Sequence, residues 1–487
     1  MPHSSASLYN AAQIREAERI AIQQLDIPAS QLMRLAGQAV FNAICQRWPL
    51  QRSMTVFCGS GNNAGDGYVV AELAITAGFE VTVFALAAPE SLPDAAQAAY
   101  QRFIAVGGRV QPLAITTACQ GIVVDALLGT GLNRAVNQTY AQAIHAINAA
   151  QLPVVAVDVP SGLHADSGNI LGVAVNATLT ITFIGLKTGL HTGMAAECCG
   201  EIILEPLALP ASILASIKPV ANLARKTPLA SRSRSAHKGS FGHVLLIGGN
   251  HGYSGAIRLA GEACLRSGAG LVSIASRAAH SGYLNIGRPE LMCHGVETAD
   301  QLTDLISKAS VIAIGPGLGQ DDWASHMLRP VFASDKPLVV DADALNLLAK
   351  QPQQRHNWLL TPHPGEAARL LACSTANIAQ DRYAAVTALQ ANYGGVVVLK
   401  GAGSLISDGQ QVLVATTGNP GMASGGMGDV LTGISAALIA QGLPLLAAAE
   451  LAVMAHGEAA DRAAKQQGER GLLAGDLLAE LRMVLNC

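Results

Sequence analysis

The chain has 487 residues, of which 50% are hydrophobic and 13% charged, and its formal net charge is −3. This length exceeds what one hydrophobic core usually fills, since domains run to roughly 100–200 residues, so two or more domains are expected. The small net charge and a pI near 6.5 exclude a strongly basic surface that would recruit nucleic acid or an anionic membrane.

The N-terminus and the cysteine pattern both indicate a cytoplasmic protein. The first ten residues have no basic region followed by an apolar stretch, so no signal peptide is predicted. The nine cysteines contain no CxxC pair and the thirteen histidines no HExxH motif, so neither residue type predicts a zinc site. Reduced and mostly buried thiols are expected.

Short β-branched runs alternate with alanine-rich amphipathic stretches in the first part of the chain. Strands are predicted at 54–58, 80–85, 122–125 and 154–158. This rhythm is typical of βαβ units, and continuously apolar strands indicate a parallel sheet covered by helices on both faces. Asp125 and Asp158 end two of these strands, where open α/β sheets bind their ligands.

A glycine-rich string, GSGNNAGDG at 59–67, follows the first of these strands and precedes a helix-like stretch at 68–77. Backbone N–H groups in such a loop can hold phosphate or pyrophosphate. The spacing differs from the GxGxxG fingerprint, and two side-chain amides with Asp66 indicate direct polar recognition or cation coordination as well. From the glycines alone, a tight turn without a binding role remains an alternative.

The strings VDALLGTGL (124–132) and VDVPSGL (157–163) share one scheme of strand, carboxylate and glycine-bearing loop. Asn63, Asp125 and Ser161 would offer an all-oxygen site for a hard cation, and Asp158 would face a substrate as acid or base. The alternative is that both aspartates only cap the loops that follow them.

A run without acidic residues, 206–261, separates the two parts of the chain. A solvated linker is the simpler interpretation, and an anionic ligand beside Lys238 or Arg258 is the alternative; no aromatic residues are interleaved for base stacking. We place the boundary near 212–230 and predict domains at 10–212 and 222–487.

The second part repeats the βαβ rhythm, with strands predicted at 244–247, 311–314, 338–340, 358–361 and 396–399.

Polar residues follow three of these strands. Asp341 and Asp343 would orient magnesium or cap the next helix, and the cap is favoured. His363 would contact a substrate or be a turn histidine bonded to backbone. Lys400 opens the string Gly401–Ser404 and would contact a nucleotide, or be an ordinary turn lysine.

The string GGMGDVLTG at 425–433 predicts phosphoryl chemistry. Its glycines let backbone N–H groups approach an anion at a helix N-terminus, and Asp429 is placed to take a proton from an incoming hydroxyl. The uncharged run 430–449 that follows is interrupted by Gln441-Gly442-Leu443-Pro444, which predicts two buried helices joined by a turn rather than a membrane span.

These strings resemble two known domains. Residues 10–212, with GNNAGDGYVVA, DALLGTGL and DVPSGL, resemble the NAD(P)H-hydrate epimerase domain. Residues 222–487, with HKGSFGHVLLIGG, GPGLG, DADALN, TPHPGE, KGAGS and GMGDVLTG, resemble the ADP-dependent NAD(P)H-hydrate dehydratase domain. In this order the chain is similar to the bifunctional NAD(P)H-hydrate repair enzymes. The resemblance implies an α/β fold with an N-terminal Rossmann-like three-layer sandwich and a C-terminal ribokinase-like three-layer α/β/α domain.

The resemblance also implies the substrates, NADHX and NADPHX, which are NADH and NADPH hydrated at carbon 6 of the nicotinamide ring. The first domain would interconvert the R and S epimers, and the second would use ADP to convert the S form to NAD(P)H, giving AMP and phosphate. Potassium in the first domain, and magnesium with ADP in the second, are implied as cofactors. The chain is expected to form a homo-oligomer, and neither a nucleic acid nor a membrane is expected as a partner.

Matching positions carry the implied site residues. The epimerase substrate contacts would be Asn62, Asn63, Ala64, Gly65, Asp66, Gly129, Thr130, Gly131, Leu132, Asn133, Arg134, Ala135 and Asp158. Potassium would be held by Asn63, Asp125 and Ser161. The dehydratase contacts to the hydrate would be Ala256, Gly317, His363 and Asp429, and those to the nucleotide Lys400, Gly401, Ala402, Gly403, Ser404 and Gly428. Asp158 and Asp429 are the candidate catalytic groups.

Two positions depart from the family pattern. Ala64 replaces the first glycine of a GNNGGDG loop, so its φ is expected to be negative or its backbone strained. Met427 stands where serine is common, which removes a hydroxyl donor near the phosphates. The alternative function is a ribokinase-like small-molecule kinase with a non-catalytic nucleotide-binding N-terminal module.

Overall fold

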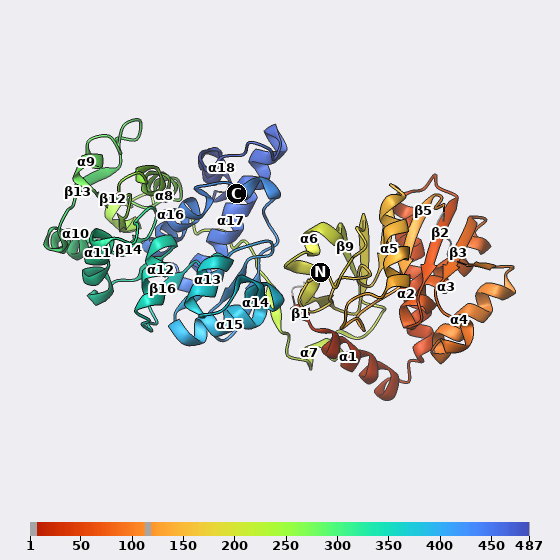
Figure 1. Ribbon diagram of the computed structural model, residues 1–487. Helices are drawn as coiled ribbons and strands as arrows, with labels where there is room; N and C mark the ends of the chain where they lie inside the picture. Colours follow the sequence, from red (N-terminus) through yellow and green to blue (C-terminus); the bar gives the residue numbers. More distant parts are fainter. Residues whose placement is uncertain (1–6, 113–117, 487) are drawn as a thin grey trace. The chain divides into compact units, whose positions relative to one another are not determined.

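The computed structural model describes residues 7–112 and 118–486. The chain is divided into two compact units, Met1–Asn222 and Leu223–Cys487, and each contains a wholly or mainly parallel sheet with helices around it (Figure 1). The first unit includes strand β1 (Ser7–Tyr9) and helix α7 (Ala211–Ala215). We refer to the two as the N-terminal and C-terminal units.

The N-terminal unit is built on a seven-stranded sheet in the order β4-β3-β2-β5-β6-β7-β9. Every adjacent pair is parallel, and the four strands predicted from apolar runs are confirmed. The strands are β2 (Ser53–Cys58), β3 (Glu80–Ala85), β4 (Val110–Gln111), β5 (Ile122–Ala126), β6 (Val154–Val157), β7 (Leu179–Phe183) and β9 (Glu201–Glu205). Strand β1 pairs with β8 (Leu186–Lys187) and β10 (Ala221–Leu223).

Helices cover both faces of this sheet, which gives three layers. Along one strand, Val56 packs in the core formed with α2 and α3, whereas the next residue, Phe57, packs in the core that includes Ile144 and Ile147 of α5. The helices are α1 (Ala11–Gln24), α2 (Ala29–Arg47), α3 (Asn62–Thr76), α4 (Asp94–Ala105), α5 (Gln138–Ala149), α6 (Ala195–Cys198) and α7.

The C-terminal unit contains a run of strands in the order β13-β12-β11-β14-β15-β16-β17-β18-β19. The strands are β11 (His243–Ile247), β12 (Leu271–Ser276), β13 (Met292–Gly295), β14 (Val311–Ile314), β15 (Leu338–Val340), β16 (Trp358–Leu360), β17 (Val396–Leu399), β18 (Leu405–Ser407) and β19 (Val412–Val414). Strands β11 to β17 pair in parallel, and the predicted ones are confirmed. The chain leaves β11 toward β12 on one side and returns to β14 on the other. Such a switch point opens a ligand crevice at the carboxyl ends of the strands.

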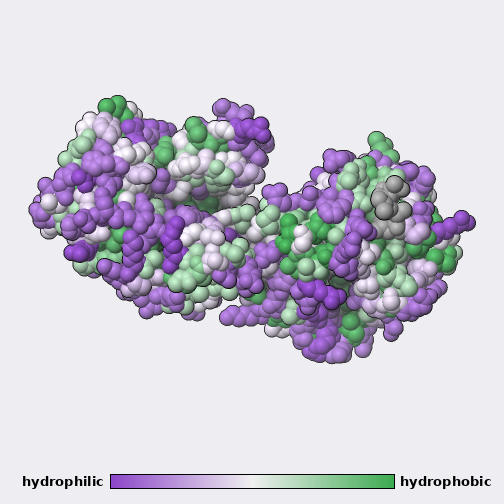
Figure 2. All heavy atoms as spheres, in the orientation of Figure 1, coloured by the Kyte–Doolittle hydropathy of each residue, from purple (hydrophilic) through white to green (hydrophobic). Residues whose placement is uncertain are grey.

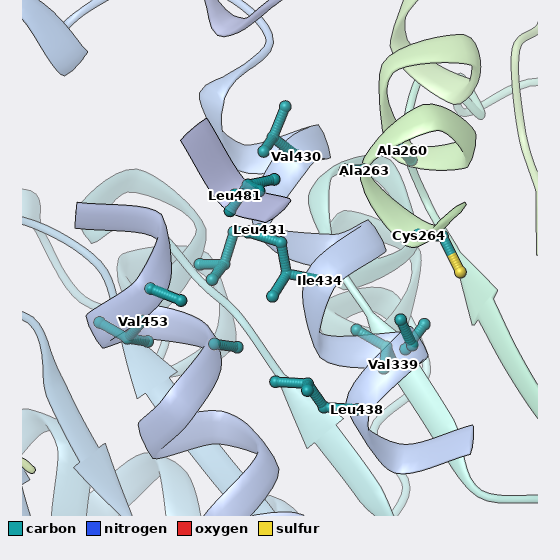
Figure 3. Close-up of a cluster of buried hydrophobic side chains, with 14 of the residues drawn as sticks. Ala260, Ala263, Cys264, Val339, Val430, Leu431, Ile434, Leu438, Val453 and Leu481 are labelled. Carbon is teal, nitrogen blue, oxygen red and sulfur yellow. The ribbon is translucent and has the colours of Figure 1, made fainter. Parts of the chain in front are cut away.

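A helical layer packs on one face of this sheet. Figure 3 shows Val430, Leu431, Ile434 and Leu438 of α16 among side chains of the neighbouring helices and Val339 of β15. Gly433 makes this packing close, because a Cβ there would lie 2.1 Å from the carbonyl oxygen of Ala260 on α8. The helices of the unit are α8 (Ser254–Arg266), α9 (Ala278–Ser281), α10 (Thr303–Lys308), α11 (Asp322–Ala333), α12 (Ala342–Lys350), α13 (Pro364–Leu370), α14 (Thr375–Gln380), α15 (Arg382–Tyr393), α16 (Met427–Ala440), α17 (Leu445–Gln467) and α18 (Leu477–Val484).

The uncharged run 430–449 forms parts of α16 and α17, and the turn that joins the two helices lies at 441–444, as predicted. None of the helices in the described ranges is long and apolar enough to cross a membrane. Figure 2 shows hydrophilic residues spread over the drawn face of each unit, with hydrophobic ones scattered among them.

Candidate active sites

The glycine-rich string of the N-terminal unit is helical rather than a loop. Helix α3 begins at Asn62, so the expectation of a loop up to residue 67 was wrong. The reason is close packing: a Cβ at Gly65 would lie 2.4 Å from the sulfur of Met33, and one at Gly67 2.6 Å from the Cβ of Ala126. These two glycines let α3 approach its neighbours.

The first turn of α3 retains the features of an anion site. Gly61 is its N-cap residue and provides no side-chain cap. The Ala64 N–H donates to the Gly61 carbonyl at 3.1 Å, so the N–H groups of Asn62 and Asn63 are those available to a ligand. Ala64 lies buried inside the helix with ordinary helical backbone, so this departure from the family pattern introduces no strain.

Asp125, the penultimate residue of β5, is in direct contact with Ser161, which lies beyond the end of β6. The Ser161 hydroxyl donates to Asp125 Oδ1 at 2.6 Å, and the Ser161 N–H donates to Oδ2 at 2.8 Å. The Ser161 oxygen also lies 3.2 Å from the carbonyl oxygen of Leu128. Burial raises the pKa of Asp125 to about 6, against the hydrogen bonds from Ser161 and Leu127 that lower it. Carboxylate, hydroxyl and carbonyl oxygens thus gather at one buried point.

Asn63 lies beside this cluster, on the first turn of α3. A Cβ at Gly129 would lie 3.5 Å from its side-chain carbon, and its buried Nδ2 has no hydrogen-bond partner among the described residues. The rest of the predicted loop, 130–135, follows β5 and is half-buried or exposed. The hydroxyl of Tyr140 on α5 lies 3.1 Å from the Ser60 oxygen, which ties this loop region to the start of α3.

Asp158 follows β6 with φ of +68°, a left-handed conformation that is uncommon outside glycine. Its Oδ1 accepts hydrogen bonds from the Thr182 hydroxyl at 3.2 Å and the Phe183 N–H at 3.3 Å, and pairs with the ammonium of Lys187. Lys187 is fully buried, and sequence reasoning missed it. The only available signal was a lone charge inside the apolar stretch 179–190, since lysine is almost never buried unless paired.

Two more carboxyl groups surround this ion pair. Asp66 on α3 is buried, and its pKa is raised well above the usual range by burial and then by Asp158 and Glu18. Burial, followed by Asp158, also raises the pKa of Glu18 on α1. Glu18 was not predicted from the sequence. We call Asp66, Asp158, Lys187 and the oxygen cluster at Asp125 the N-terminal site.

The C-terminal site gathers at the carboxyl edge of the second sheet. Gly317 follows β14 with φ of +57°, and a Cβ there would lie 3.2 Å from the Cβ of Ala256 in the first turn of α8. A Cβ at Gly426, the residue before α16, would lie 2.6 Å from Leu259 of the same helix. The predicted residues Ala256 and Gly317 therefore lie side by side, next to the helix that carries Asp429.

Asp341 joins three elements and does not cap α12. It occupies the N-cap position, but its Oδ1 accepts from Lys400 Nζ at 2.8 Å and its Oδ2 from the Thr432 hydroxyl at 2.7 Å. The favoured helix-cap role was therefore wrong for Asp341, because a half-buried lysine and a buried threonine compete for its carboxylate. Asp343 accepts from the Gly319 N–H at 2.9 Å.

The turn before α16 has the features of an anion site. Gly426 has φ of +92° and provides no side-chain cap, so the N–H groups of the first helical turn remain available. Asp429 lies in that turn, and burial, followed by the nearby Asp341, raises its pKa to about 7 against a lowering effect of Lys400. Met427 is buried in the core of the unit.

His363 is a helix cap. Its Nδ1 accepts from the Gly365 N–H at 2.9 Å, while the Glu366 carboxylate accepts from the His363 N–H at 2.8 Å. The turn-histidine alternative is thus realised at Nδ1, and Nε2 lies 3.3 Å from Glu366 Oε1. Burial, followed by Lys400, lowers the pKa of His363.

Lys400 follows β17 and opens the loop 401–404. Gly401 and Gly403 have φ of +142° and +63°, and the Ser404 hydroxyl donates to the Gly401 carbonyl at 3.0 Å. Arg382 of α15 lies buried beneath the loop, where its guanidinium donates to the carbonyls of Leu399 at 3.3 Å and Gly403 at 3.2 Å. This supporting arginine was not found from the sequence, because it lies before the motif on another element.

Helix α17 holds the segment that precedes the α16 turn. The Asp461 carboxylate accepts from the Gly418 N–H at 3.0 Å and the Asn419 amide at 2.9 Å. His456 is buried on the same helix, and burial lowers its pKa to about 4. Within the two described ranges, no group of three or more His, Cys, Asp and Glu residues is arranged to hold a metal ion.

Comparison with known proteins accounts for both units. The sequence model described as NAD(P)H-hydrate dehydratase matches residues 244–482, and that described as YjeF-related protein N-terminus matches residues 29–189. The bifunctional NAD(P)H-hydrate repair enzyme of Coxiella burnetii is 48% identical over 98% of this chain and 99% of its own length. That of Escherichia coli is 44% identical over 100% of this chain and 95% of its own.

A solved structure of the ADP/ATP-dependent NAD(P)H-hydrate dehydratase from Bacillus subtilis is 29% identical, covering 53% of this chain and 93% of that chain with a TM-score of 0.49. The relatives of Coxiella and Escherichia span both units at well over 30% identity. The chain therefore belongs to the family of bifunctional NAD(P)H-hydrate repair enzymes, in which an epimerase domain is joined to a dehydratase domain.

Proposed function

We propose that repair of hydrated NADH and NADPH is carried out by Asp429 in the C-terminal site and by the surroundings of Asp158 in the N-terminal site. The observation that carries this proposal is the position of Asp429. It lies in the uncapped first turn of α16, burial raises its pKa to about 7, and the Lys400 to Asp341 ion pair is adjacent. A carboxyl with a pKa near neutrality is well suited to accept a proton.

In the dehydratase reaction Asp429 takes the proton of the carbon 6 hydroxyl of the S hydrate. Hydroxide is a poor leaving group, whereas phosphorylation of the hydroxyl lets phosphate, a good leaving group, depart in its place. ADP, bound as its magnesium complex, would supply the phosphoryl group and leave as AMP. The ring nitrogen then expels phosphate from carbon 6, and loss of a proton from carbon 5 restores the dihydronicotinamide.

The residues around Asp429 have distinct parts in this step. The free N–H groups of the α16 turn stabilise the negative charge that develops on the phosphoryl oxygens. Lys400, at the start of its glycine loop, offsets charge on the nucleotide, and Gly428 leaves room for it: a Cβ there would lie 3.3 Å from Lys400 Nζ. We assign Ala256, Gly317 and Nε2 of His363 to the hydrate, and Gly401, Ala402, Gly403 and Ser404 to the nucleotide.

The N-terminal site fits a potassium ion. Asp125, Ser161 and the Leu128 carbonyl present oxygen atoms to one buried point. Asn63 lies beside Gly129 of the loop that follows, and its side-chain oxygen would complete the set. Such a hard, all-oxygen donor set suits a cation of this kind. Potassium would neutralise Asp125 and hold the loop after β5. Asn62, Asn63, Ala64, Gly65, Asp66 and the residues from Gly129 through Ala135 are assigned to the substrate, with Asp158 as the acid or base.

The test of this proposal is recovery of NADH absorbance from a mixture of hydrate epimers, with magnesium and either ADP, ATP or no nucleotide. Fast and complete recovery with nucleotide supports both activities, because the dehydratase alone consumes only the S form. Recovery that stops at the S fraction contradicts the epimerase assignment, and absence of recovery with either nucleotide contradicts the dehydratase assignment.

We also propose a cytoplasmic location and a homo-oligomer. The eight cysteines at described positions are all free thiols, which is typical of proteins in a reducing compartment. Light scattering coupled to gel filtration tests the oligomer, and a mass equal to one chain contradicts it.

A further inference from the structure

A buried ammonium group divides the carboxyl groups of the N-terminal site into two kinds. Lys187 is fully buried, and its Nζ contacts Asp158 Oδ1, the Thr182 hydroxyl at 2.9 Å and the Phe183 carbonyl at 2.8 Å. Its three protons therefore each have an acceptor. A charged amine removed from water is stable only when it is paired in this way.

Asp66 is the opposite case in the same site. It is 9% exposed, and its carboxyl has no hydrogen-bond partner among the described residues. Burial and the nearby carboxylates of Asp158 and Glu18 raise its pKa, against a smaller effect of Lys187, so it retains its proton more readily than an ordinary aspartate. Two carboxyl groups whose surroundings differ in this way take opposite parts in proton transfer.

Inversion at carbon 6 needs one proton acceptor and one proton donor by either available route. In ring opening, a base takes the hydroxyl proton, carbon 6 becomes a carbonyl, the bond from carbon 6 to the ring nitrogen breaks, and an acid protonates that nitrogen. In loss of water, the ring nitrogen's electron pair expels the hydroxyl as an acid protonates it, and a base deprotonates the water that adds to the other face. Each route reverses with the protons returned, and neither needs an oxidant or reductant.

Resting on the epimerase function proposed above, we infer that Lys187 is a positioning residue that holds Asp158 as the proton acceptor and leaves Asp66 as the proton donor. The arrangement works through geometry as well as charge. Asp158 has left-handed backbone, and the contacts from Lys187, Thr182 and Phe183 all converge on its Oδ1, which leaves Oδ2 for the substrate.

Lys187→Met in the full-length chain tests the positioning role, since methionine keeps the length and apolar body of the side chain. Initial rates of R to S interconversion are measured from pH 5.5 to 9, beside dehydration of the pure S epimer as an internal control. In this variant Asp158 has the carboxyl groups of Glu18 on α1 and Asp66 on α3 nearby, and β8 no longer provides a cation to offset their negative charge. We expect the epimerisation rate to fall at least about tenfold, its acid limb to move to higher pH, and dehydration to stay at the wild-type rate.

Lys187→Arg keeps the charge and should restore part of the rate together with the wild-type acid limb. A wild-type rate and pH profile in Lys187→Met overturns the inference, as does a lower thermal stability with an unchanged pH profile. Should Lys187→Met not fold, Lys187→Arg alone decides: a lower epimerisation rate with the wild-type acid limb supports positioning, and an unchanged rate contradicts it.

Asp66→Asn tests the donor assignment separately. It retains the shape of the side chain and removes the proton, so epimerisation should fall by about two orders of magnitude. Epimerisation at the wild-type rate overturns the donor role. If the wild-type chain itself does not accelerate epimerisation above the spontaneous rate, the proposed epimerase function is contradicted, independently of any variant.

Discussion

Replacing Asp429 by asparagine should stabilise the C-terminal unit while abolishing its activity. In the folded chain burial raises the pKa of Asp429 from 3.8 to about 7. The folded carboxyl therefore keeps its proton up to about pH 7, whereas the unfolded one releases it near pH 4. Wild-type stability is lost as pH rises between these values, and asparagine, which is always neutral, avoids that loss.

The magnitude follows from the size of the shift. About three pKa units correspond to about 4 kcal/mol of unfolding free energy, which is reached above pH 7. Near pH 5 only the first unit or so has been lost, about 1–2 kcal/mol. We expect Asp429→Asn to exceed wild type by at most about 4 kcal/mol at pH 8, and the advantage to be about 2–3 kcal/mol smaller at pH 5.

The assay is urea unfolding of the full-length chain at the two pH values, with Trp323 and Trp358 reporting on the C-terminal unit. Asp322→Asn, which removes an exposed carboxylate from α11, is the matched control and should keep the wild-type pH dependence. An advantage of Asp429→Asn that is equal at pH 5 and pH 8 would refute the electrostatic reasoning. Nucleotide-dependent recovery of NADH should fall by about two to four orders of magnitude while epimerisation continues, and retained recovery would refute the base role.

Three further predictions follow from single contacts. Arg382→Ala removes charged hydrogen bonds beneath the 400–404 loop, so the KM for ADP should rise about tenfold with little change in the KM for the hydrate; equal changes in both would argue against a nucleotide loop. Asp125→Asn should abolish stimulation of epimerisation by potassium over sodium, with at least about a tenfold loss of potassium affinity, and undiminished stimulation would place the ion elsewhere. Gly433→Ala inserts a Cβ 2.1 Å from the Ala260 carbonyl oxygen, so the free energy of unfolding should fall by about 1–3 kcal/mol. The control is Gly255→Ala, whose Cβ meets no atom within 4 Å and which should not lower the free energy of unfolding. Equal effects of the two variants in urea unfolding would contradict the packing argument.

Much of the fold follows from local sequence alone. Continuous apolar runs such as 122–125 and 311–314 are buried on both faces of a parallel sheet, so their composition reports their environment directly. Gly426, Asp429 and the apolar residues after them mark the start of α16, because a left-handed cap and a helical period are both local properties. The positions of Asp125 and Asp158 near the ends of their strands also predicted that both lie at the same edge of the sheet, because parallel strands have their carboxyl ends at one edge.

Only the tertiary structure decided which charges meet. Lys187 pairs with Asp158 across 29 residues, and Lys400 with Asp341 across 59. No local pattern encodes such a pair, because the two partners lie on or just after strands that are far apart in the sequence and meet only when the domain folds. The same holds for the start of α3, where contacts of Gly65 and Gly67 with distant side chains turned an expected loop into helix. Backbone preference is local, whereas desolvation and pairing of charge depend on the packing of the whole domain.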